Sequence, residues 1–216
     1  MSQEIIEFNI NGLVLQEPMA LITNWMMSFF SVYAFFKLKK SENTERNDWK
    51  KFFFWFAITS FFGGLGHLFF QQLGVPGKFP NWSISIIAAF YAGLAMLSAY
   101  EKRKWNKELK YFLFIKGIVL LSLAIISQLF IFIAIDAILT YVIYCGIIGK
   151  VLAVSKSKVY NQMFYGVLVC LPSVFIFLFK LNIHRWLNKD DLSHLLMLAC
   201  LFFFYRGAKM LSLQNK

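Results

Sequence analysis

Charged residues are scarce in this chain of 216 residues: Asp, Glu, Lys and Arg together make up 15% of it, whereas soluble domains carry about 25%. Hydrophobic residues account for 59% and aromatic residues for 19%, with 26 phenylalanines. A soluble fold of this length has too little interior to bury so many large apolar side chains. The composition therefore excludes an ordinary soluble enzyme and predicts an integral membrane protein whose surface faces lipid.

Cysteine and linker-forming residues are also rare. Cys145, Cys170 and Cys200 all lie within apolar runs and form no CxxC motif, so we expect them to be packing residues without a disulfide framework. No stretch rich in Pro, Gly and Ser divides the chain, which predicts a single domain over residues 1–216. The N-terminal segment carries Glu4, Glu7 and Glu17 but neither a basic region nor a cleavage site, so we expect no signal peptide.

The apolar runs predict an all-α bundle of transmembrane helices. A bilayer core about 30 Å thick needs about 20 apolar residues per crossing. The apolar run over residues 111–148 is too long for one crossing, and we divide it at Ser127 and Gln128. We expect Pro172 to bend the sixth helix. The seven predicted helices cover residues 19–36, 52–72, 82–100, 111–127, 129–148, 160–179 and 191–205.

The distribution of positive charge supports this count. The net charge is +11, and 17 of the 22 Lys and Arg residues fall in alternate loops and the C-terminal segment, against four on the other side. The positive-inside rule then predicts an outer N-terminus and a cytoplasmic C-terminus in a plasma or inner membrane, and it excludes a nucleic-acid partner. Lys116, the remaining basic residue, is expected to snorkel to the cytoplasmic interface.

Histidines and aspartates concentrate toward the predicted outer end of the bundle. His67 is near the outer end of the second helix, Asp136 lies in the outer third of the fifth, and the remaining candidates surround the start of the seventh: His184, Asp190, Asp191 and His194. Ionisable groups in a membrane are costly, so each is a functional candidate. On the second helix, small and polar residues form one stripe that we expect to face neighbouring helices: Ala57, Ser60, Gly64, His67 and Gln71.

Two histidines and a carboxylate brought to similar depth predict a zinc site. We expect His67, Asp190 and His194 as ligands, with His184 as a fourth ligand or a loop residue. Such a site requires the two ligand histidines to lie within about 8 Å of each other. Asp136, or whichever of Asp190 and Asp191 does not bind metal, is a candidate to orient a ligand or act as a base. The alternative is that Asp190 and Asp191 cap the seventh helix.

This pattern resembles the superfamily of alkaline ceramidases and adiponectin-receptor-type proteins. The resemblance rests on seven helices, on His67 late in the second helix and on Asp190-x-x-x-His194 opening the seventh. It implies a zinc ion held by these residues that hydrolyses the amide of a ceramide-like lipid. The family has a serine one turn before the helix-2 histidine, where this chain has Gly63; Ser60 lies one further turn away. The family's acidic residue near helix 3 is missing, and Asp136 is the candidate substitute.

Two classes of function follow. The first is a zinc-dependent hydrolase that cleaves an amide or ester bond of a membrane lipid, with Ser60, Asp136 and Asp191 as candidate catalytic residues. The alternative is a transporter, receptor or structural subunit in which the cluster is a proton or cation relay or provides packing polarity. A haem protein is a third option, with His67 and His194 as axial ligands.

Overall fold

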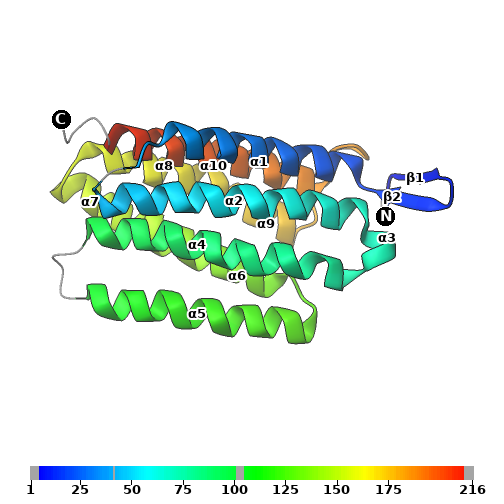
Figure 1. The fold of residues 1–216 in the computed structure, drawn as a ribbon, viewed down its shortest axis with the longest axis horizontal. Helices are drawn as coiled ribbons and strands as arrows, with labels where there is room; N and C mark the ends of the chain where they lie inside the picture. Colours follow the sequence, from blue (N-terminus) through cyan, green and yellow to red (C-terminus); the bar gives the residue numbers. More distant parts are fainter. Residues whose placement is uncertain (1–4, 41, 101–104, 212–216) are drawn as a thin grey trace.

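The computed structural model describes residues 5–40, 42–100 and 105–211. Its long helices run side by side along one axis, with a small β-hairpin at one end of the bundle and the C-terminus at the other (Figure 1). Within these ranges, six helical segments are long and apolar enough to cross a membrane: Pro18–Lys37, Val75–Ala99, Asn106–Ser127, Ile131–Ser155, Lys158–Leu178 and Lys189–Leu211. This is the architecture of a multi-pass membrane protein.

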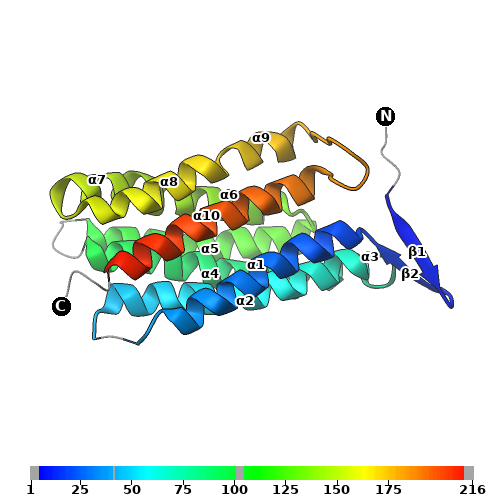
Figure 2. The same cartoon turned by 90° about the horizontal axis from the view of Figure 1, so that it is seen from above.

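A further long helix, α2 (Thr44–Leu68), is not among the six. Its first two turns carry several charged side chains, whereas the part after Lys51 is rich in Phe. It runs beside α1 (Pro18–Lys37) in both views (Figures 1 and 2). Of the basic residues counted in the loops, Lys102, Arg103, Lys104 and Lys216 lie outside the described residues, as does Glu4.

Of the remaining helical rods, some are single long helices and others are built from shorter pieces. The chain continues through α3 (Phe70–Leu73), the 3-10 turn η1 (Val75–Lys78), α4 (Phe79–Ala99) and α5 (Asn106–Ser127). The next rod comprises α6 (Ile131–Leu139), the π-helical η2 (Thr140–Ile148) and α7 (Gly149–Ser155). The last two rods comprise η3 (Lys158–Tyr160), α8 (Asn161–Cys170) and α9 (Pro172–Leu178), and then α10 (Lys189–Leu211).

Two breaks in these rods have visible causes. After α5 ends at Ser127, Gln128 adopts the left-handed conformation with φ of 57°, which reverses the chain where the sequence divides the long apolar run. Pro172 begins α9 immediately after α8 ends, because a proline cannot donate the hydrogen bond that would continue the preceding helix.

The N-terminal segment forms a β-hairpin, which the all-α prediction does not include. Strands β1 (Glu7–Ile10) and β2 (Leu13–Gln16) pair antiparallel around Asn11 and Gly12. Both turn residues have positive φ, 53° and 88°, as a two-residue Asn-Gly turn requires. The Gln72 side chain donates to the carbonyl of Val14 over 2.8 Å, which ties the hairpin to α3.

Aromatic side chains fill the core and glycine allows the helices to approach. Trp49, Phe52 and Phe204 are fully buried and contact one another. A Cβ atom on Gly63 would lie 2.9 Å from Oδ1 of Asn24 on α1, so only glycine fits here without a shift. The predicted stripe does face neighbouring helices at Ala57, Ser60 and Gly64 of α2, which are buried. His67 is half-buried, and Gln71 lies beyond the end of α2, on α3, and is exposed.

Lys116 does not snorkel to the interface, so that prediction is wrong. It lies in the middle of α5, 7% exposed, and its ammonium group forms an ion pair with the Asp136 carboxylate of α6, which is 1% exposed. The same ammonium donates to the Asp136 carbonyl over 3.3 Å. The prediction failed because α5 begins at Asn106, earlier than expected, which places Lys116 about 15 Å from the helix start. At that depth a partner within the bundle satisfies the charge.

Candidate metal centre

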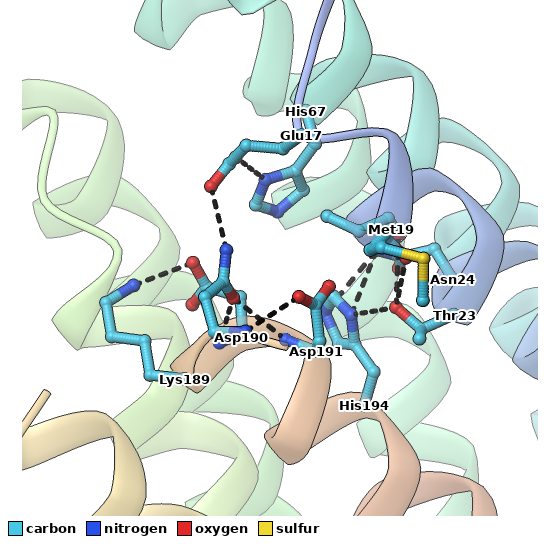
Figure 3. Close-up of polar contacts among 11 residues, drawn as sticks. Glu17, Met19, Thr23, Asn24, His67, Lys189, Asp190, Asp191 and His194 are labelled. Carbon is cyan, nitrogen blue, oxygen red and sulfur yellow. Dashed lines mark hydrogen bonds and ion pairs between the residues drawn. The ribbon is translucent and has the colours of Figure 1, made fainter. Parts of the chain in front are cut away.

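Glu17, His67 and Asp190 form a cluster that can hold a metal ion. One ligand atom from each residue lies within 4.8 Å of the others, and all three residues are half-buried. Two metal–ligand bonds of about 2 Å span about 4 Å, so small side-chain movements close the site around an ion. One imidazole and two carboxylates are donors that zinc accepts. Figure 3 shows the three side chains together with His194 around one common space.

Glu17 is the candidate ligand that the sequence did not reveal. It lies between β2 and α1 in the left-handed conformation, with φ of 47° and ψ of 57°. This conformation is unfavourable for glutamate and is typical of residues held in place for function. The signal available in the sequence was an acidic residue directly before Pro18, at the start of the chain's first apolar run. Its nearness to His67 depends on the hairpin, which the sequence reading did not include.

Hydrogen bonds fix both oxygens of Glu17. Oε2 lies 2.6 Å from Nδ1 of His67, and Oε1 accepts a 3.3 Å hydrogen bond from the Asn188 side chain. Burial alone would raise the pKa of Glu17, but the hydrogen bond and the charge of His67 outweigh burial and hold the pKa below its usual value of 4.5. Glu17 is therefore an ionised carboxylate at neutral pH, as a metal ligand must be.

The start of α10 assigns different roles to the two adjacent aspartates. The Asn188 side chain accepts hydrogen bonds from the backbone N–H groups of Asp190 and Asp191, and Asp191 accepts one in return from the Asn188 N–H over 2.9 Å. This reciprocal arrangement is a capping box. Asp191 thus caps the helix, while Asp190 projects into the cluster, where Nζ of Lys189 lies 2.7 Å from its carboxylate.

His194 lies beside the cluster. Its ring centroid is 6.0 Å from that of His67, with the ring planes nearly perpendicular. This distance is within the limit of about 8 Å that a shared metal requires. Nδ1 of His194 is 2.9 Å from the Thr23 hydroxyl, and the Asn24 amide nitrogen is 3.4 Å from both ring nitrogens. Contacts with α1 therefore hold this ring in place.

The other predicted site residues lie away from the cluster. His184 is exposed in the turn between α9 and α10, where its Nδ1 accepts the Trp186 N–H over 3.2 Å. Ser60 lies two turns before His67 on α2. Ser60 and Asp136 both line a large cavity that also reaches His67. Within the described ranges, neither belongs to the group of potential metal ligands.

Two cavities meet at the cluster. The smaller has a volume of about 340 Å³ and is lined by the N-terminal segment and the α9–α10 connection, including Glu17 and Asp190. The larger has a volume of about 630 Å³ and extends from His67 and Asp190 along α6 to Val142. Most residues that line the larger cavity are apolar, such as Phe56. Volumes of about 300–1,000 Å³ are typical of small-molecule sites.

The helices and this site define a multi-pass helical membrane protein with a histidine–carboxylate cluster at one end of its bundle. The chain matches the family of unknown function DUF6962 over residues 19–213 and belongs to that family. No curated protein and no solved structure matches the chain.

Proposed function

We propose that this protein is a zinc-dependent hydrolase that cleaves an amide or ester bond of a membrane lipid. The observation that carries the proposal is the position of Glu17, His67 and Asp190: their ligand atoms lie within 4.8 Å of one another where a cavity lined by several charged residues meets a mostly apolar one. A lipid presents its scissile bond at such a junction, between its headgroup and its acyl chain. The residues that carry the resemblance to alkaline ceramidases lie at the same end of the bundle.

Different residues of the chain would have different roles in such a site. Glu17, His67 and Asp190 would hold the ion, and His194 beside them would complete the ligand set or exchange a proton with the substrate. When bound, zinc polarises a carbonyl oxygen and makes a water molecule acidic. Asn188 and Thr23 orient Glu17 and His194 through hydrogen bonds, as outer residues do in metal sites. The apolar cavity excludes water from the acyl chain.

The proposal includes a topology. We propose seven crossings, with α2 as the additional one, an outer N-terminus and a cytoplasmic C-terminus in a plasma or inner membrane. The Phe-rich part of α2 after Lys51 and its packing beside α1 support a crossing by this helix. The unequal count of 17 basic residues in the segments predicted to be cytoplasmic against four in the segments predicted to be outside supports the orientation.

Metal analysis of gently purified protein tests the proposal. We expect about one zinc per chain in the wild type and its loss in His67→Ala and Asp190→Ala. His184→Ala is the matched control, because His184 is exposed and lies outside the cluster. Release of fatty acid from membrane lipid extracts should follow metal content across these variants. A wild type without metal, or a His67→Ala variant that retains full zinc, would refute the assignment.

One observation favours a second candidate function. The Lys116–Asp136 ion pair is buried in the bundle, and Asp136 lines the larger cavity. Buried ionisable pairs beside a cavity are typical of proton and cation relays. In that case Asp136→Asn should abolish proton flux in reconstituted vesicles. Wild-type vesicles that show no flux above empty vesicles would reject the relay.

A further inference from the structure

The end of the bundle that holds the cluster carries few basic residues, and all of them lie at the two cavities. The loops of this end contain four Lys and Arg residues in total, against 17 in the sequence segments predicted to be cytoplasmic. Lys180 and Arg185 line the smaller cavity, Lys78 lines the larger one, and Lys189 lines both. Basic residues are disfavoured in the outer loops of membrane proteins. Their confinement to the cavities therefore indicates a local role.

Neutralising the acidic residues of the cluster accounts for only some of these cations. Lys189 forms an ion pair with Asp190 over 2.7 Å. Within the part of the chain that the structure describes, Lys180 and Arg185 form no ion pair. Lys78 lies over the Phe70 ring and is close enough to Glu17 and Asp190 to interact with their charges. Glu17 is bonded to His67 and Asn188, and Asp191 to the Asn188 backbone. Lys180 and Arg185 are thus available to an anion, and a metal ion in the cluster would add further positive charge.

The two cavities together match a lipid. The lining of the larger one follows the α6–η2 rod from Ile131 to Val142, a distance of about 16 Å at about 1.5 Å per residue. Large apolar side chains, such as Phe177 and Leu171, form much of its wall. The cations lie at its Lys78 and Lys189 end and in the adjoining smaller cavity. An amphiphile with an anionic head and an apolar chain complements both spaces.

We propose that the lipid recognised at this site carries a phosphate headgroup, which Lys180, Arg185, Lys189 and Lys78 bind while its acyl chain lies in the larger cavity. This inference rests on the proposed function, since it names the class of lipid that the hydrolase would take. The guanidinium of Arg185 donates paired hydrogen bonds that fit phosphate oxygens, and the lysines add point charges. The scissile bond would then lie beside His67 and Asp190, where the cavities meet.

Binding measurements on chelator-treated protein in detergent test the inference without turnover. The ligands are dioctanoyl phosphatidic acid, dioctanoylglycerol, which has the same chains without phosphate, and inorganic phosphate. We expect the phosphatidic acid to bind at least about tenfold more tightly than either of the others, because charge-assisted hydrogen bonds and chain burial both contribute. Equal affinity for dioctanoylglycerol would overturn the headgroup assignment. Equal affinity for inorganic phosphate would overturn the role of the acyl chain.

Substitutions identify the binding residues. The double variant Lys180→Gln/Arg185→Gln should weaken binding of the phosphatidic acid at least about tenfold and leave dioctanoylglycerol binding unchanged. Lys39→Gln/Lys40→Gln, two exposed lysines at the opposite end, is the matched control and should change neither. An unaffected double variant would overturn the inference. Because metal is absent from this assay, its result is independent of the zinc analysis, so each proposal can fail alone.

Discussion

Breaking the buried Lys116–Asp136 ion pair should cost far more stability than replacing both of its partners. The two residues are 7% and 1% exposed, so either single substitution leaves an uncompensated charge inside the bundle. Removing one partner of a buried pair costs about 3–5 kcal/mol, whereas replacing both by apolar residues of similar volume is often neutral. We therefore expect Lys116→Met and Asp136→Leu to be strongly destabilising alone and within about 1 kcal/mol of the wild type together.

Thermal unfolding in detergent measures this difference. For a chain of this size, about 2–4 °C of Tm corresponds to each kcal/mol, so each single variant should lose about 6–20 °C. Lys107→Met, an exposed lysine on the same helix, is the matched control and should leave Tm nearly unchanged. If Lys116→Met behaved like Lys107→Met, the lysine would reach the interface and the buried pair would be refuted. Single losses that simply add in the double variant would equally contradict a coupled pair.

Three further predictions concern packing, pH and topology. Gly166→Ala places a Cβ 2.8 Å from a ring and 3.2 Å from a backbone carbonyl of α10, so it should lower the stability by about 1–3 kcal/mol. Gly66→Ala is the control, because its nearest contact is 3.4 Å, and equal losses of stability in thermal unfolding would contradict the close approach. Because the pKa of Glu17 is held below 4.5, its carboxylate stabilises the fold above that pH. The difference in stability between the wild type and Glu17→Gln should therefore shrink as the pH falls below 4.5, and a difference that grew in acid would refute the prediction. Asn11→Cys and Lys107→Cys should react with an impermeant maleimide from opposite sides of the membrane, against a low background from three buried native cysteines; labelling from one side would overturn the proposed topology.

Hydropathy located the helices because lipid imposes a minimum length on every crossing. The long apolar run ends its first helix at Ser127, and a proline opens α9, both of which are local features that a sequence displays. The helix ends were harder to predict from the sequence. The helix α5 begins at Asn106 and α10 continues to Leu211, beyond their apolar parts, because helix formation does not stop where hydropathy falls. The hairpin was missed because its strands of four residues each are too short to show a clear alternation.

Part of the candidate site could be predicted from the sequence. The predicted helices place His67, Asp190 and His194 at a similar depth in the membrane, and in the structure these side chains lie around one space. Depth could not separate Asp190 from Asp191, because that choice depends on the Asn188 capping box. Depth also could not predict the ion pair between Lys116 and Asp136, because which sides of two helices face each other depends on how the helices pack. Glu17 required a backbone turn that no periodicity reveals.

Asn188 has a consequence for how the bundle is made. Its side chain both caps the last helix and reaches Glu17, which is 171 residues earlier in the chain. Glu17 emerges from the ribosome long before α10 does, and although His67 on α2 follows early, Asn188 and Asp190 arrive only after every intervening helix. The ligand cluster therefore cannot exist in a partly inserted chain. Metal occupancy would then report completed assembly as well as competence for chemistry, and in a chain stalled before its final helix Glu17 would have His67 as a partner but neither Asn188 nor Asp190.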